Sequence, residues 1–175
     1  MSKLALVHIA HTGHVLGVVS RTAPYNTAPP PADLVGSGFP IRDPHLGDLL
    51  LTIGTNWLQG SLIDFRTDVL MDPFEFQKDN GGVKIVVKQL PPQAPPFTLQ
   101  LGGSGLTLTG ATAVPSDRKV FAQIERASTN ERYPLTGTLA ANQTSVLLGV
   151  GGLVGKYQVI VFLDGFFPLR KELLV

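Results

Sequence analysis

Leu-Thr-Leu-Thr-Gly-Ala-Thr at residues 106–112 indicates the fold, because Leu and Thr alternate there before a glycine ends the run. Alternation at period two is typical of a half-buried β-strand. Similar short segments follow at 120–124, 146–148 and 157–163. An earlier copy starts with Leu-Leu-Thr-Ile-Gly-Thr-Asn-Trp at 50–57 and continues at 62–65, 84–87 and 97–101. Short strands between Gly and Pro turns predict an all-β sandwich. Two copies indicate a structural module rather than an active site.

The two copies resemble immunoglobulin-like modules of the IPT/TIG type. The resemblance is carried by Leu-Thr-Ile-Gly-Thr-Asn-Trp at 51–57, by the run at 106–112, and by the chain end from Gly155 to Gly165. It implies one module at 48–101 and a second at 102–175, or a single sandwich formed by 48–175. It also implies a recognition or spacer role, since these modules share no catalytic residues.

Residues 3–20 predict a β-hairpin that turns at Thr12-Gly13. A two-residue turn there would place His11 opposite His14, Ile9 opposite Leu16, and Val7 opposite Val18. Both faces of such a hairpin are largely apolar, unlike those of a hairpin with one face in water. We therefore expect it either to lie inside the fold or to dock on a partner chain. The candidate interaction residues from this hairpin are Val7, Ile9, His11, His14, Leu16 and Val18.

A proline-rich stretch follows at 21–47 and completes a predicted N-terminal region at 1–47. Its six prolines and weak periodicity favour a long connection. It could be a spacer on the surface of the chain or an arm that embraces a neighbouring subunit. Phe39 is its candidate interaction residue.

The region from 58 to 88 predicts further strands. Alternation at 63–69 indicates one strand, with Asp64, Arg66 and Asp68 on a solvated face. Asp79-Asn80-Gly81-Gly82 predicts a hairpin turn into 83–88. Apart from a short turn near Trp57, no helix is expected, because the chain holds 14 prolines and 19 glycines.

The charge content argues against several partners. The chain has 14 basic and 13 acidic residues without a cluster of either sign, so we expect no nucleic-acid binding. Charged residues make up 15% of the chain, below the roughly 25% usual for soluble domains. This deficit favours self-association or burial in an assembly, although a polar uncharged surface is the alternative.

The chain also lacks signals for export or membrane insertion. Cysteine is absent, and no run approaches 18 apolar residues. His8 and His11 interrupt the apolar N-terminus, and no small-residue cleavage site follows. We expect cytoplasmic synthesis without a signal peptide and no membrane partner.

No motif predicts catalysis or a cofactor. On a strand His8 and His11 point to opposite faces, so only His11 and His14 could meet, and two imidazoles make an incomplete zinc site. Residues 149–156 lack the spacing of a phosphate loop and read as a turn between strands. We therefore expect no enzyme activity, no metal and no cofactor.

Taken together, these patterns predict a non-enzymatic structural subunit that self-associates or packs into a larger particle, such as a phage-tail-like or shell assembly. Its partners would be proteins, including copies of itself in a homo-oligomer. The alternative is a β-sandwich binding module for carbohydrate or a protein ligand. An exposed aromatic such as Trp57 would serve that second role.

Overall fold

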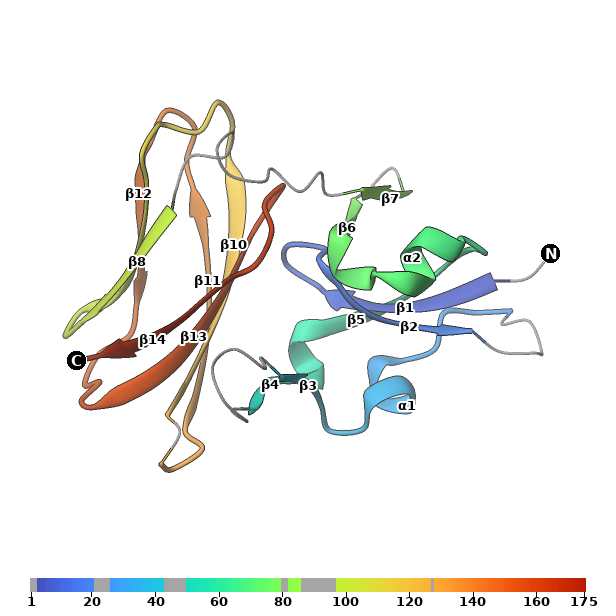
Figure 1. Cartoon of the computed structure of the whole chain (residues 1–175), viewed down its shortest axis with the longest axis horizontal. Helices are drawn as coiled ribbons and strands as arrows, with labels where there is room; N and C mark the ends of the chain where they lie inside the picture. The colour runs from blue at the N-terminus through green and yellow to red at the C-terminus, as the bar shows by residue number, and fades with distance from the viewer. Residues whose placement is uncertain (1–2, 21–25, 43–49, 80–81, 86–96, 127) are drawn as a thin grey trace. The chain divides into compact units, whose positions relative to one another are not determined.

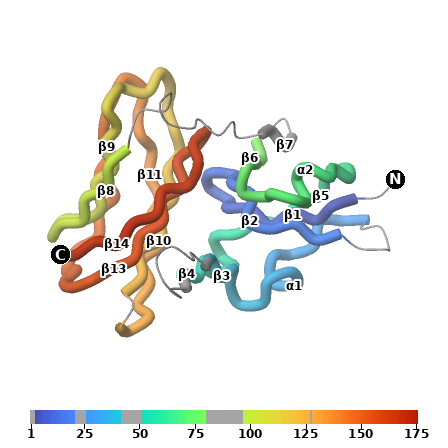
Figure 2. The backbone as a smooth tube through the Cα atoms, in the orientation of Figure 1, coloured from blue at the N-terminus to red at the C-terminus, as the bar shows by residue number. Residues whose placement is uncertain are grey.

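The computed structural model describes residues 3–20, 26–42, 50–79, 82–85, 97–126 and 128–175. The chain forms two compact units, of which the first comprises Met1–Ile41 and Thr52–Lys88 and the second Arg42–Leu51 and Gln89–Val175. Figures 1 and 2 trace both units, which are almost entirely β-structure in the described residues. The all-β prediction is confirmed.

The second unit is a sandwich of two antiparallel sheets. One sheet has the order β12-β9-β8, formed by β8 (Phe97–Gly102), β9 (Gly105–Gly110) and β12 (Ser145–Gly149). The other has the order β11-β10-β13-β14, formed by β10 (Arg118–Arg126), β11 (Arg132–Leu139), β13 (Lys156–Leu163) and β14 (Leu169–Leu174). The chain passes between the sheets after β9, β11 and β12. This is an immunoglobulin-like arrangement, except that the fourth strand pairs with the third rather than with the fifth.

The sandwich core follows from the alternation of apolar residues. Leu106 and Leu108 of β9, Val120 and Ala122 of β10, and Val159 of β13 are all 0% exposed and belong to one apolar cluster. Phe121, Ile160 and Phe162 have the opposite parity and lie outside that cluster, yet they are also buried. β10 and β13 are therefore buried on both faces, although the outer face also holds the buried polar residues Gln123, Glu125 and Gln158.

The first unit contains a three-stranded sheet with the order β2-β1-β5, formed by β1 (Lys3–Ile9), β2 (Val15–Ser20) and β5 (Leu58–Asp64). One face of this sheet presents Leu4 and Leu6, which pack against Val69 of α2 (Thr67–Met71) and Phe76 of β6 (Phe76–Asp79). The 3₁₀ turn η2 (Pro73–Glu75) joins α2 to β6, and β6 pairs with β7 (Gly82–Ile85).

The described part of the proline-rich stretch packs within this same unit. It contains α1 (Pro31–Val35) and β3 (Gly38–Arg42), and β3 pairs with β4 (Leu50–Gly54). The Pro29 carbonyl lies where a side chain on Gly60 of β5 would be, and the Phe39 ring lies against Gly17 of β2. Over residues 26–42 the stretch is therefore not a free arm, because it packs on the chain's own sheet.

The hairpin register differs from the predicted one. Val7 lies opposite Gly17, and Leu6 rather than Val7 lies opposite Val18. Two local features cause the shift. The turn is longer than two residues, with the Ile9 N–H donating to the His14 carbonyl, and a bulge between Val7 and His8 places an extra residue in β2.

Other predictions met mixed outcomes. The turn at 79–82 is confirmed, since Asp79 pairs with Gly82, although residues 80–81 and 86–88 lie outside the described residues. The predicted strand at 63–69 is wrong, because β5 ends at Asp64 and α2 begins at Thr67. Asp64 instead pairs with Lys3, and Asp68 pairs with Arg66. The short turn near Trp57 is η1 (Thr55–Trp57).

The two units do not follow the predicted boundaries at 47 and 101. Residues 48–101 do not form a module of their own, because β5 pairs with β1 whereas β8 pairs with β9. One sandwich, described from Phe97 to the C-terminus, thus contains the second copy together with the last strand of the first.

Candidate functional site

The apolar hairpin residues predicted to contact a partner lie inside the chain. Val7, Ile9 and Leu16 are at most 1% exposed, so they present no surface. Val18 is half-buried against the cluster under α2, and Phe39 is half-buried against Gly17. Of the two possibilities for a hairpin that is apolar on both faces, the structure shows the one in which the hairpin lies inside the fold.

The three histidines that the structure describes, His8, His11 and His14, are not part of a metal-binding group. His14 is buried, bonds through Nδ1 to the Thr12 hydroxyl at 2.9 Å and forms a bridge with Gln77, whereas His11 is half-buried at the turn. Across the described ranges, no group of three His, Asp or Glu side chains could hold a metal ion.

Sequence reasoning missed a hydrogen bond between His8 and Ser61. His8 Nε2 lies 2.8 Å from Ser61 Oγ, and Nδ1 lies 3.4 Å from the Ile9 carbonyl. Because a carbonyl only accepts, Nδ1 carries the proton and Nε2 accepts the Ser61 hydroxyl. Burial lowers the pKa of His8 below its ordinary value. The two residues are 3% and 6% exposed, so the pair links β1 to β5 beyond the reach of a substrate.

Trp57 is half-buried in η1. Tyr133 and Tyr157 contact each other edge to face at 6.4 Å, but Tyr157 is 1% exposed. Tyr157 therefore packs in the core and offers no exposed ring face to a sugar.

One side of the sandwich is closed. There β11 of one sheet and β12 of the other come so close that a side chain on Gly137 would meet Leu148 at 2.5 Å. Glycine at this position lets Leu148 fill the gap between the sheets, and Leu148 is only 3% exposed.

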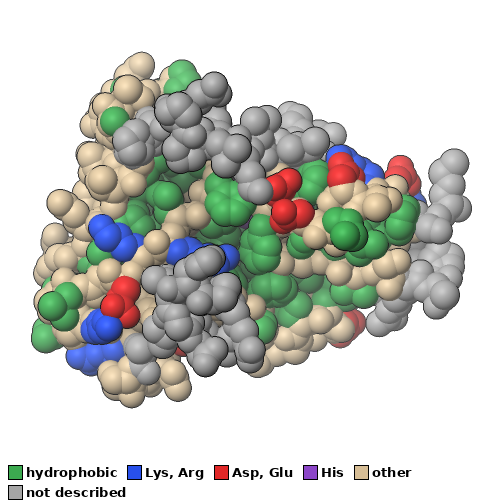
Figure 3. Space-filling view, in the orientation of Figure 1, with side chains coloured by type: hydrophobic (Ala, Val, Ile, Leu, Met, Phe, Trp, Pro, Cys, Tyr) green, Lys and Arg blue, Asp and Glu red, His purple; other side chains and the backbone are tan. Residues whose placement is uncertain are grey.

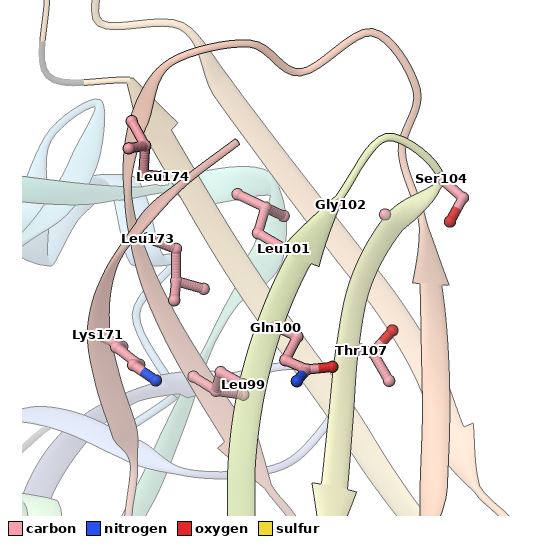
Figure 4. Close-up of a pocket in the computed structure, with 10 residues that line it drawn as sticks. Leu99, Gln100, Leu101, Gly102, Ser104, Thr107, Lys171, Leu173 and Leu174 are labelled. Carbon is pink, nitrogen blue, oxygen red and sulfur yellow. The ribbon is translucent and has the colours of Figure 1, made fainter.

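The opposite side is open and forms a groove. Between β8 and β14 lies a cavity of about 500 Å³, lined by Leu99, Gln100, Leu101, Gly102, Ser104, Gly105, Thr107, Lys171, Leu173 and Leu174. Figure 4 shows Leu99 and Leu101 projecting from β8 towards β14, with Leu173 on the facing strand. Leu99 is nearly buried, whereas Leu174 at the rim is 78% exposed. The groove therefore leads from an exposed leucine to the edge of the core.

Both strands that border the groove are sheet edges. β8 and β14 stand at the ends of their sheets among the described strands. An edge strand presents unpaired N–H and C=O groups that can pair with another chain. β14 also carries three consecutive charged residues next to the groove, Arg170, Lys171 and Glu172. Glu172 accepts a hydrogen bond from Lys156 Nζ at 2.7 Å.

Only one of the two strands that border this groove was predicted from a local pattern. Alternation in Phe-Thr-Leu-Gln-Leu at 97–101 predicted a strand, but nothing local says that β8 lies beside the C-terminal strand. The position of β8 beside β14 depends on how the chain passes between the two sheets, and only the structure shows this path.

Comparisons with protein-family models, curated proteins and solved structures find no match to this chain. The IPT/TIG resemblance thus stays an expectation. None of the described helices has the length and apolar character to cross a membrane. On the face in Figure 3, Lys and Arg are interspersed with acidic, apolar and other side chains rather than gathered in a stripe.

Proposed function

We propose that this protein is a non-enzymatic structural subunit that self-associates, and that the open side of its sandwich carries the contact. The observation that supports this most directly is that β8 and β14 stand at the ends of their sheets among the described strands, with a groove between them that leucine and polar side chains line together. An uncovered edge next to exposed leucine is a liability for a solitary domain and a means of attachment for a subunit.

The chemistry of the chain agrees with this proposal. Exposed large apolar side chains in the sandwich are Leu147, Val154, Phe167 and Leu174, in a chain with few charges. Association would cover such side chains. Val7, Ile9, His14 and Leu16 of the hairpin are buried, so we place the contact at the sandwich edge instead.

The test is the native mass of the full chain, measured by size-exclusion chromatography with light scattering. We expect a discrete species of at least twice the 18.7 kDa chain mass. A species that stays at 18.7 kDa at concentrations of about 100 μM and above would contradict self-association.

The groove itself supports a second candidate function. Its volume of about 500 Å³, its mixed lining of leucine and polar side chains, and the two edge strands beside it suit an extended peptide, which would make the protein a binding module. A monomer whose groove residues shift in NMR spectra on addition of such a peptide would favour this candidate.

A further inference from the structure

The free edge of β14 has a defined hydrogen-bonding pattern. Gly155 and Val175 exchange both backbone hydrogen bonds, at 3.0 and 2.9 Å. In an antiparallel ladder such pairs alternate with non-bonded ones, so Leu173 and Lys171 also turn their backbone groups towards β13. The N–H and C=O groups of Arg170, Glu172 and Leu174 therefore point away from β13, to the free edge.

We propose that β14 pairs antiparallel with β14 of a second copy, about a two-fold axis that passes midway between Lys171 and the partner's Lys171. This inference rests on the proposed function and names its partner and its register. Arg170 then lies opposite Glu172 of the partner subunit, and Glu172 lies opposite the partner's Arg170. The two four-stranded sheets would become one continuous sheet.

Symmetry and charge select this register. When two copies pair about an axis perpendicular to the sheet, each residue lies opposite a residue on the same face. The axis must then pass midway between two copies of the same residue. An axis between the two copies of Arg170, or between the two copies of Glu172, would place like charges opposite each other in a hydrogen-bonded pair. The axis between the two copies of Lys171 instead forms two opposite-charge pairs, which stabilise cross-strand neighbours.

Lys171 meets the partner's Lys171 in this arrangement, as a pair without backbone hydrogen bonds. Its side chain is exposed at the groove, so the two long ammonium-bearing chains can diverge into water. Glu172, which already accepts from Lys156 Nζ of its own chain, would then also lie opposite the partner's Arg170, so opposite charges outnumber like charges across the axis.

Apolar contacts favour the same register. On the core side, Leu169 lies opposite Leu173 of the partner subunit, and both positions are partly buried against the sandwich core. The exposed Leu174 lies opposite the partner's Pro168, which has no N–H and so ends the ladder.

Single cysteines test the register, because the chain has none of its own. In a non-hydrogen-bonded pair the Cα atoms are about 4.5 Å apart, within disulfide range. We expect Lys171→Cys to give a disulfide-linked dimer under mild oxidation at least about tenfold faster than Glu172→Cys. In this register the two copies of residue 172 are diagonal neighbours, beyond the roughly 7 Å limit. Leu147→Cys on β12, where Leu147 is 54% exposed, is the control for random collision.

Three outcomes would overturn the inference: equal rates for all three variants, a faster reaction for Glu172→Cys, or no cross-link at Lys171→Cys. If the wild-type chain is still an oligomer by light scattering, only this inference fails and the proposed function stands. If the wild-type chain is a monomer, the proposed function fails as well.

Charge reversal gives an independent readout. Arg170→Glu and Glu172→Arg should each shift the native mass from dimer towards monomer, because each opposes like charges across the axis. The double variant R170E/E172R restores both pairs in this register and should recover the dimer. A double variant no more dimeric than either single variant would overturn the inference.

Discussion

At the scale of single residues, Gly13 fixes the tip of the N-terminal hairpin. It adopts φ +80°, and a β-carbon there would lie 2.0 Å from the Lys78 carbonyl oxygen. The close approach exists because the Lys78 N–H donates to the Gly13 carbonyl at 2.8 Å.

Gly13→Ala should therefore destabilise the protein by about 2 kcal/mol or more, through both the left-handed backbone and the clash. Gly152→Ala is the matched control, since Gly152 has φ +75° with no neighbouring atom within 4 Å and should cost only about 1 kcal/mol. Urea unfolding measures both, and equal losses would show that the contact with Lys78 is unimportant.

His8 gives the chain a pH-dependent stability. Burial lowers its pKa in the folded state, helped by Lys78, while the Ile9 carbonyl acts in the opposite sense. The unfolded chain therefore binds a proton near pH 6.5 that the folded chain does not bind. The His8 contribution is present in full above that pH and is lost as pH falls towards the folded-state pKa.

We expect the free energy of unfolding to decrease between pH 7.5 and 5.5, and His8→Gln to reduce this decrease. Chemical denaturation across that range is the measurement. If the free energy of unfolding of His8→Gln decreases with falling pH as steeply as that of the wild type, other groups cause the pH dependence.

At the scale of elements, a buried tyrosine is one of the contacts that hold the loop from β12 to β13. The Tyr157 hydroxyl bonds to both the N–H and the carbonyl of Val154, at 3.2 and 3.3 Å. The Arg126 guanidinium stacks over the same ring at 5.6 Å.

Tyr157→Phe should cost about 1 kcal/mol, because it removes the hydroxyl and keeps the ring contacts. Hydrogen exchange at the Val154 amide should become faster. Tyr133→Phe, which leaves the Val154 contacts in place, is the control and should leave that amide unchanged. Unchanged exchange at Val154 in Tyr157→Phe would show that the loop does not depend on this contact.

The same scale shows what the sequence could predict. Strands β9, β10 and β13 follow from alternation and apolar runs that are local properties of the chain. The pairing of β5 with β1 could not be read from the run at 50–57, because that run resembles the one at 106–112 but meets different partners. The shifted register of β2 depends on a bulge, and the groove depends on two strands about 70 residues apart.

At the scale of the whole molecule, low charge and an open sheet edge act together. The net charge is +1, so long-range repulsion between copies is weak and short-range pairs decide whether two copies stay together. A contact through β14 stabilises the folded chain by mass action, since only folded β14 can pair.

The melting temperature should therefore rise with protein concentration. A tenfold increase contributes about 1.4 kcal/mol per dimer, or about 0.7 kcal/mol per chain, which corresponds to a rise of about 2 °C for a chain of this size. Circular dichroism from about 5 to 500 μM should detect this rise in the wild-type protein and in R170E/E172R, but not in Arg170→Glu. If the melting temperature of the Arg170→Glu variant also rises with protein concentration, the association uses a surface other than β14. A wild-type melting temperature that does not change with concentration would mean that association does not stabilise the fold.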